Sequence, residues 1–284
     1  MASVHERLVE ARHVLTGAGI DVDEAALDAE VLARHVLGWD RAGLIARWRE
    51  PAPAAFTEAL ARLVARRAAR EPVAYITGRR EFWGLEFEVT SDVLIPRPET
   101  ELVIEEALRF SQEVRLPASV IDVGTGSGCI AISLACELPL SHVTATDISP
   151  AALAVARRNA ARLGVDRRLT LINGDLLDGT PAAVDLIVSN PPYVPAQDAP
   201  TLQPEVGRHE PAVALFGGNG DGLDVVRRLF ASASTHLAQG GRLIIEFGFG
   251  QAPAVGVAAR SAGWEIVRMI PDLQNIPRVA VLRR

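Results

Sequence analysis

The stretch that decides the fold is Ser119-Val120-Ile121-Asp122-Val123-Gly124-Thr125-Gly126-Ser127-Gly128. Its apolar first half predicts a strand over 119–123, and its glycine-rich second half predicts a tight turn leading into a helix. Glycines let a backbone pass close to a bound ligand without side chains in the way. The dinucleotide pattern Gly-x-Gly-x-x-Gly would need its third glycine at position 129, which is Cys129. The observed spacing therefore favours a nucleoside ligand, with NAD as the alternative.

Beyond this turn, strand and helix patterns alternate to the end of the chain. The predicted strands are 119–123, 142–147, 168–173, 184–189, 241–247, 264–270 and 277–283. The predicted helices between them are 127–137, 150–163, 221–237 and 250–262. Such alternation is typical of an α/β fold, in which a parallel sheet carries helices on both faces. Ligands of such sheets bind at the carboxyl ends of the strands.

Two aspartates follow predicted strands at that edge. Asp147 ends the second strand, about twenty residues past the glycine turn, where a carboxylate can accept hydrogen bonds from both ribose hydroxyls. The alternative is a cap for the helix that begins at Ser149-Pro150. Asp175 follows the third strand and is placed to receive an adenine amino group, or else is a plain turn residue. Leu176 can offer its backbone N–H and an apolar wall to the ring.

The run Asn190-Pro191-Pro192-Tyr193 lies where the strand 184–189 ends. Two prolines stiffen the loop and leave its carbonyls free to accept hydrogen bonds. The Asn190 side-chain oxygen and the Pro191 carbonyl can hold the two hydrogens of one –NH₂ group, while Tyr193 packs against the planar group that carries it. Fixed acceptors would stabilise the positive charge that this nitrogen gains on methylation by a sulfonium cofactor. A rigid turn with an asparagine cap is the alternative.

The first 75 residues have helical periodicity over 8–15, 27–36 and 56–64. Period-two alternation over 81–90 predicts a β-hairpin, and Pro98 followed by glutamates predicts a helix start. The sequence therefore predicts three parts. These are a helical bundle over 1–78, a β-hairpin linker over 79–95 and an α/β domain over 96–284.

Composition sets the class of protein. With 284 residues, 49% hydrophobic and 23% charged, the chain resembles an ordinary globular protein. No run of roughly 18 to 20 apolar residues and no signal peptide is evident, so we expect no membrane partner and a cytoplasmic location. Cys129 and Cys136 are seven apart in a predicted helix, beyond disulfide reach, and the six histidines lack metal-ligand spacing. We therefore expect no metal site.

Charge argues against a polyanion-binding protein. The net charge is −6, and the densest basic cluster is Arg62, Arg66, Arg67 and Arg70. Such a cluster is most often the solvated face of a helix, and we expect no stable binding of nucleic acid.

The glycine turn, Asp147 and Asn190-Pro191-Pro192-Tyr193 resemble class I S-adenosylmethionine-dependent N-methyltransferases. The stretches 81–85, 94–101 and 210–215, with the helical N-terminal part, are similar to the release-factor glutamine N5-methyltransferase (HemK/PrmC) family nearly end to end. The resemblance implies a Rossmann-like methyltransferase domain with a mostly parallel seven-stranded sheet. It also implies S-adenosyl-L-methionine as cofactor, with S-adenosyl-L-homocysteine as product.

The same resemblance implies a substrate and the residues that bind it. The substrate would be the glutamine of the Gly-Gly-Gln loop of class 1 peptide-chain release factors, docked with help from the N-terminal domain. Catalytic and substrate-binding roles fall on Asn190, Pro191, Pro192 and Tyr193, with Arg97, Glu99 and Thr100 beside the glutamine. Cofactor contacts fall on Gly124, Thr125, Gly126, Ser127, Gly128, Asp147, Asp175, Leu176 and Asn190. Leu176 stands where the family can carry an aromatic residue, which puts stacking on adenine in question.

Two other functions stay open at this point. One is methylation of a glutamine in a large-subunit ribosomal protein, although the intact segment 97–101 favours release factors. The other is an adenine-N6 nucleic-acid methyltransferase, which would need a base-flipping pocket and a target-reading domain. A non-enzymatic binding module would not explain why the acceptor motif and the cofactor turn occur together.

Overall fold

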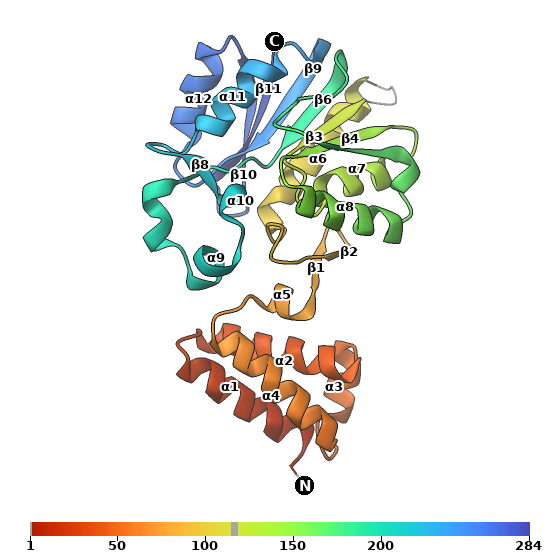
Figure 1. Ribbon diagram of the computed structural model, residues 1–284, viewed down its shortest axis with the longest axis vertical. Coiled ribbons are helices and arrows are strands. Elements are labelled where there is room, and N and C mark those ends of the chain that lie inside the picture. The colour runs from red at the N-terminus through yellow and green to blue at the C-terminus, as the bar shows by residue number, and fades with distance from the viewer. Residues whose placement is uncertain (1, 115–118) are drawn as a thin grey trace. The chain divides into compact units, whose positions relative to one another are not determined.

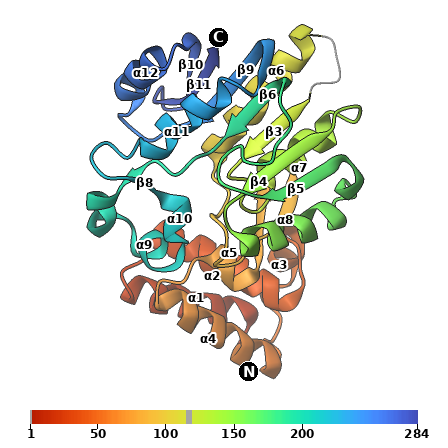
Figure 2. The ribbon, with the colours of Figure 1, turned by 45° about the horizontal axis from the view of Figure 1, so that its top comes forward.

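The computed structural model describes residues 2–114 and 119–284. The chain forms two compact units (Figures 1 and 2). One unit consists of Met1–Gly78 together with Gln203–His209, and the other of Arg79–Leu202 together with Glu210–Arg284. A short segment from the second half of the chain therefore belongs with the N-terminal helices.

The N-terminal unit is helical. Its helices are α1 (Val4–Gly17), α2 (Val22–Leu37), α3 (Arg41–Arg47), α4 (Ala54–Ala68), α5 (Val73–Thr77) and α9 (Pro204–His209). Ser3 and Glu6 form a capping box at the start of α1, and Asp21 and Asp40 cap α2 and α3. The predicted helical pattern is confirmed, but its apolar residues do not all face inward. Leu27 is 58% exposed, whereas α2 buries small alanines that allow close helix packing.

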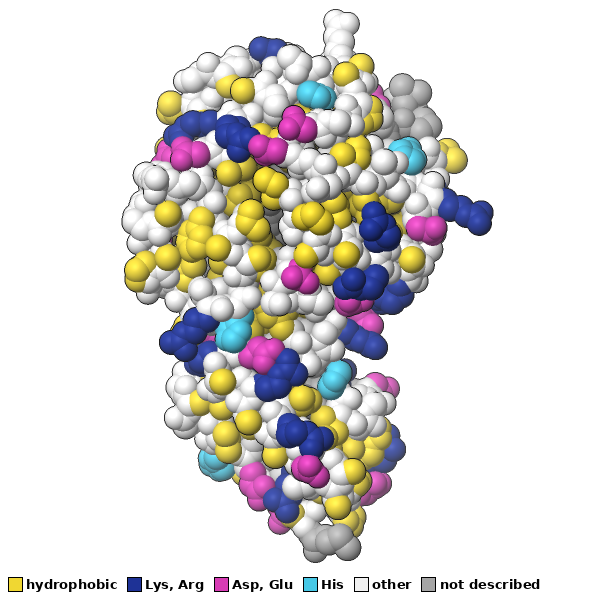
Figure 3. Space-filling model, viewed as in Figure 1, with side chains coloured by type: hydrophobic (Ala, Val, Ile, Leu, Met, Phe, Trp, Pro, Cys, Tyr) yellow, Lys and Arg dark blue, Asp and Glu magenta, His cyan; other side chains and the backbone are white. Residues whose placement is uncertain are grey.

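The basic cluster on and just after α4 is not uniformly exposed to solvent, which corrects the expectation for Arg67. Arg67 is only 1% exposed. Its guanidinium donates to Asp28 (2.6 Å), Glu24 (2.8 Å) and Glu205 of α9 (2.6 Å). Three carboxylates thus compensate one buried charge, as a buried cation requires. Basic and acidic side chains are also interspersed over the visible face of this unit (Figure 3).

The larger unit opens with the predicted hairpin. Strands β1 (Arg79–Phe82) and β2 (Leu85–Glu88) pair antiparallel around Trp83 and Gly84. Both turn residues have positive φ, 53° and 66°, as a two-residue turn matching the strand twist requires. The helix start predicted at Pro98 is confirmed, because the 3-10 turn Pro98–Thr100 leads directly into α6 (Glu101–Val114).

A seven-stranded, mostly parallel sheet forms the body of this unit, as predicted. Its order is β10-β11-β9-β6-β3-β4-β5, and only the pairings of β11 are antiparallel among those described. The strands are β3 (Val120–Val123), β4 (Val143–Asp147), β5 (Leu169–Asn173), β6 (Val184–Ser189), β9 (Leu237–Glu246), β10 (Glu265–Pro271) and β11 (Pro277–Arg283). The main helices between them are α7 (Cys129–Glu137), α8 (Pro150–Arg162), α11 (Asp224–Ala233) and α12 (Ala252–Ser261). Successive strand residues point to opposite faces.

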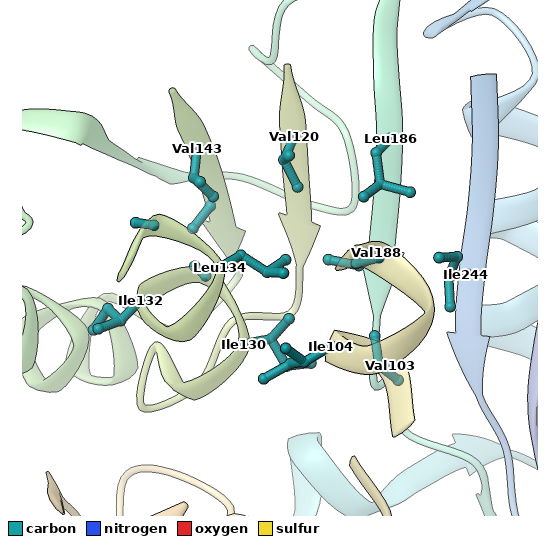
Figure 4. Packing of buried hydrophobic residues seen from close by; sticks show 14 of the residues in the cluster. Val103, Ile104, Val120, Ile130, Ile132, Leu134, Val143, Leu186, Val188 and Ile244 are labelled. Carbon is teal, nitrogen blue, oxygen red and sulfur yellow. The ribbon is translucent and has the colours of Figure 1, made fainter. Parts of the chain in front are cut away.

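Two apolar cores lie on the two faces of the sheet. Val120, Leu186 and Val188 pack with residues of α6 and α7 (Figure 4). Ile121 and Ile187, their chain neighbours, pack with α11 and α12 on the other face. Within residues 2–114 and 119–284, no helix is both long and apolar enough to span a membrane.

The connection after β6 has structure of its own. It contains β7 (Val194–Pro195), the 3-10 segment η3 (Ala196–Thr201), α9, α10 (Ala212–Leu215) and β8 (Phe216–Gly218). A further 3-10 turn, η2 (Asp166–Arg168), precedes β5. Strands β7 and β8 pair in parallel, which holds the residues after Tyr193 against the far end of the connection.

Candidate active site

The glycine turn after β3 gives its three glycines different tasks. Gly124, Gly126 and Gly128 all have positive φ, at 73°, 55° and 84°. In the described part of the chain, no heavy atom lies within 4 Å of a Cβ built on Gly124 or Gly126. A Cβ on Gly128 would instead lie 2.7 Å from Ile132 Cδ1. The first two glycines therefore leave open space beside the turn, and the third permits close packing of α7.

A buried carboxylate holds this turn from below. Asp122 is fully buried and accepts hydrogen bonds from Thr125 Oγ1 (2.6 Å) and from the Ala131 amide (3.2 Å). Burial raises the pKa of Asp122 to about 7, with a smaller upward effect of Asp147. The Thr125 hydroxyl therefore already donates its hydrogen to a buried group, and the Ser127 side chain is buried as well. Their predicted cofactor contacts would have to come from the backbone.

Asp147 connects β4 to the same turn. Its Oδ2 accepts from the Gly126 amide and its Oδ1 from the Ser149 amide, both over 2.8 Å. The helix cap itself is Ser149, whose hydroxyl accepts from the Ala152 amide. Burial raises the pKa of Asp147, while the two amide donors lower it. Each carboxylate oxygen retains a lone pair for a further donor, such as a ribose hydroxyl.

A cavity of about 240 Å³ lies at the carboxyl ends of these strands. Its wall brings together seven residues that the sequence placed in the site, namely Gly124, Asp147, Asp175, Leu176, Asn190, Pro191 and Pro192. Among the residues that the structure describes, its wall does not include Thr125 to Gly128, Tyr193, or the segment 97–100. Asp175 pairs with Arg228 of α11, which also lines the cavity.

Behind Asn190 lies a buried polar network that sequence reasoning missed. Asn190 Nδ2 donates to Thr100 Oγ1 (3.0 Å), and Thr100 Oγ1 donates to Glu246 Oε2 (2.6 Å). The Tyr193 hydroxyl donates to Glu246 Oε1 over 3.2 Å. Burial raises the pKa of Tyr193, and so does the Glu246 carboxylate. The only signal in the sequence was a glutamate at the end of an apolar strand.

The backbone of the Asn-Pro-Pro-Tyr loop is packed between glycines. A Cβ on Gly217 would overlap the carbonyl oxygens of Pro192 and Gly222, and one on Gly222 would overlap that of Tyr193. Gln251 adds a side-chain clamp, because its Nε2 donates to the Tyr193 carbonyl over 2.8 Å. These contacts fix the loop that carries Asn190.

A second ion pair fixes the segment before α6. Arg97 donates to Glu210 Oε1 over 2.5 Å, and the Ile95 amide donates to Glu210 Oε2 over 3.2 Å. Glu210 is buried, whereas the Arg97 side chain is partly exposed. Arg97 is therefore held by a residue within the connection after β6, and Thr100 by Asn190 and Glu246, which precede and follow it.

Comparison with known proteins identifies the family of this chain. Family models for the PrmC N-terminal domain and the methyltransferase small domain match residues 6–78 and 103–204. The release factor glutamine methyltransferase of Cereibacter sphaeroides is 47% identical over 269 residues, covering 95% of this chain and 94% of the relative. The chain belongs to the release factor glutamine methyltransferase family. Another member, from Deinococcus radiodurans, is 42% identical over 282 residues, covering 99% of this chain and 98% of its own.

One solved structure resembles this chain in its fold. A methyltransferase from Pyrococcus furiosus superimposes with a TM-score of 0.50 at 20% identity, over 77% of this chain and 95% of that one. The Rossmann-like methyltransferase fold predicted for this chain is therefore confirmed, and the enzyme is a methyltransferase.

Proposed function

We propose that this enzyme methylates the side-chain amide nitrogen (N5) of the glutamine in the Gly-Gly-Gln loop of class 1 peptide-chain release factors. S-adenosyl-L-methionine is the proposed methyl donor. The observation that carries the proposal is the place of Asn190, which lines the same cavity as Gly124 and Asp147 and is held from behind by Thr100. The proposed acceptor for an –NH₂ group and the proposed nucleoside-binding turn would thus share one space.

The residues of the cavity fit S-adenosylmethionine. The space beside Gly124 is open, the Asp147 carboxylate has lone pairs left for ribose, and Leu176 offers an apolar wall. We propose that Asp175 receives the adenine amino group. When bound, the cofactor supplies a methyl group on a positively charged sulfur.

The chain's own contribution is to hold and polarise the substrate amide. The Asn190 side-chain oxygen and the Pro191 carbonyl would accept the two amide hydrogens. As the nitrogen gains positive charge, these fixed dipoles stabilise it more than the neutral amide. Tyr193 would pack beside the glutamine, with Arg97, Glu99 and Thr100 near it. The proton can leave after transfer, so no strong general base is required.

The test is methyl transfer from labelled S-adenosylmethionine to a purified class 1 release factor. The controls are the same factor with its Gly-Gly-Gln glutamine replaced, a large-subunit ribosomal protein, and duplex DNA. Label on the intact factor alone is the expected result. Label on the ribosomal protein or on DNA would keep the Asn190 chemistry and refute the proposed substrate. We also propose that the release factor is the enzyme's partner and that the enzyme forms no stable complex with nucleic acid. The proposed compartment is the cytoplasm.

A further inference from the structure

The side-chain amide of Asn190 can be turned by 180° with almost no change in shape. The turn exchanges a hydrogen-bond acceptor for a donor. The proposed reaction needs the oxygen toward the glutamine, because only an oxygen can accept the hydrogens of a substrate –NH₂ group. A contact on the other side of the amide must therefore select the orientation.

Thr100 makes that contact. Its Oγ1 lies 3.0 Å from Asn190 Nδ2 and 2.6 Å from Glu246 Oε2. A hydroxyl has one hydrogen to donate, and an ionised carboxylate can only accept. Once Glu246 takes the hydrogen of Thr100, Thr100 can only accept from Asn190. Accepting requires the –NH₂ end of the Asn190 amide, which leaves the oxygen for the cavity.

We propose that Thr100 and Glu246 are positioning residues that hold the Asn190 amide with its oxygen toward the substrate glutamine. This inference rests on the proposed function and adds roles for two residues behind the cavity wall. Tyr193 completes the arrangement, since its hydroxyl occupies the second oxygen of Glu246 at 3.2 Å. The hydrogen bonds then run in one direction, from Asn190 through Thr100 to Glu246.

Burial makes this arrangement depend on the charge of Glu246, which is 2% exposed. Burial raises the pKa of Glu246 to about 7, although hydrogen bonds from the Thr100 and Tyr193 hydroxyls lower it. Two more distant charges have smaller effects on this pKa: Glu99 raises it and Arg278 lowers it. Cys129 also interacts with this carboxylate, but burial raises the pKa of its thiol to about 12. Glu246 therefore titrates near neutral pH, while Tyr193 and Cys129 stay neutral there.

Protonation of Glu246 would release the constraint. Its own O–H could then donate to Thr100, which would be free to donate to the oxygen of a turned Asn190 amide. The fixed orientation is thus present above the pKa of Glu246 and lost below it. The rate of methyl transfer should rise with pH through that pKa.

Two variants of Thr100 distinguish the effect of its hydroxyl group on kcat from the effect of its side-chain volume. Thr100→Val keeps the shape and should lower kcat about tenfold, the effect of about one net hydrogen bond, with cofactor affinity unchanged. Thr100→Ser keeps the hydroxyl and should retain most of the wild-type kcat. Ser111→Ala is the matched control, because it removes a buried hydroxyl that donates to Ala107 within α6. Equal kcat in Thr100→Val and wild type would overturn the proposal.

The pH profile tests the same inference without relying on Thr100→Val folding. Single-turnover rates of wild type from about pH 5.5 to about pH 8.5 should show a limb that falls toward acid. Glu246→Gln cannot ionise and should give a lower, flat profile with unchanged cofactor affinity. Because the pKa of Asp122 is also about 7, the comparison is made in an Asp122→Asn background as well. An acid limb that persists there in Glu246→Gln, or no limb in wild type, would contradict the inference. Failure of wild type to methylate any release factor would instead overturn the proposed function itself, and this inference with it.

Discussion

At the scale of single residues, Asn190 should affect catalysis most directly. Asn190→Ala removes the proposed acceptor for the substrate –NH₂ group, and one lost polar contact in a transition-state site costs about 10²–10³-fold in kcat. Cofactor affinity should fall much less, because Asp147 and the glycine turn are unchanged. Single-turnover rates and calorimetric titration of the cofactor separate the two effects. Equal single-turnover rates in variant and wild type would remove Asn190 from the mechanism.

Asp147 should have the reverse effect. Asp147→Ala removes the proposed acceptor for ribose and also frees the amides of Gly126 and Ser149. Hydrogen bonds to charged groups contribute about 1.5–3 kcal/mol, so the cofactor Kd should rise about 10- to 100-fold. Titration with S-adenosyl-L-homocysteine measures this directly. Asp147→Asn keeps one acceptor oxygen, so its Kd for the cofactor should lie between those of wild type and Asp147→Ala. An unchanged Kd in Asp147→Ala would exclude a ribose contact.

At the scale of elements, the packing of β8 under the Asn-Pro-Pro-Tyr loop is the sharpest constraint. Gly217 has no room for a Cβ because the carbonyl oxygens of Pro192 and Gly222 occupy it, and backbone atoms cannot move aside cheaply. Gly217→Ala should shift the loop and lower kcat about 10²-fold, as small misplacements of reacting groups do.

Gly220→Ala, in the same connection, is the control for that variant. Within the described residues, nothing lies within 4 Å of a Cβ at this position, but its φ is 65°. It should therefore lose about 1–2 kcal/mol of stability from backbone strain and retain wild-type kcat. If both variants keep wild-type kcat, the close packing under the loop does not matter for catalysis.

The buried ion cluster of the N-terminal unit gives a prediction about stability. Arg67→Ala would leave Asp28 buried without its partner, and breaking a buried pair costs about 3–5 kcal/mol. The calorimetric unfolding transition should move to clearly lower temperature, and a second change, Asp28→Ala, should recover part of the loss. Arg62 pairs with Glu58 at the surface, so Arg62→Ala should stay within about 0.5 kcal/mol of wild type. Similar transitions for both arginine variants would contradict a structural role for Arg67.

The elements themselves could be predicted because their signals are local. The apolar run 184–189 and the glycine turn at 124–128 each report on a few neighbouring residues, and the structure has a strand and a turn there. The burial of Arg67 could not be predicted in this way, since it depends on Glu205, 138 positions later in the chain. In sequence it looked like any arginine on a helix.

At the scale of the whole molecule, the same limit explains what was missed in the site. Residues predicted from the sequence, such as Gly124, Asp147 and Asn190, end or follow strands, and a parallel sheet brings strand ends to one edge. The support behind them depends on Thr100 and Glu246, which are 146 positions apart and meet only in the folded chain. Their residue types are unremarkable in sequence, and only burial turns them into a network.

Burial of two carboxylates gives the folded molecule a pH dependence with a definite sign. Burial raises the pKa of both Asp122 and Glu246 to about 7, above the value near 4 expected in the unfolded chain. The folded state therefore holds more protons between about pH 4 and 7, and this contribution to stability falls as pH rises. Asp122→Asn cannot ionise, so its free energy of unfolding relative to wild type should increase by roughly 1–4 kcal/mol from pH 4 to pH 7 and then stay level.

Urea unfolding of Asp122→Asn and wild type at several pH values measures this difference. Asp272 provides a comparison of opposite sign, because the Arg278 guanidinium lowers the pKa of that carboxyl. Its stabilisation is present above the unfolded pKa and is lost as pH falls, so Asp272→Asn should lose stability relative to wild type as pH rises. A difference for Asp122→Asn that does not change with pH would mean that folding does not raise the pKa of Asp122. The glycine turn would then rest on a charged carboxylate, and the hydrogen bonds of Thr125 and Ala131 would offset the cost of burying it.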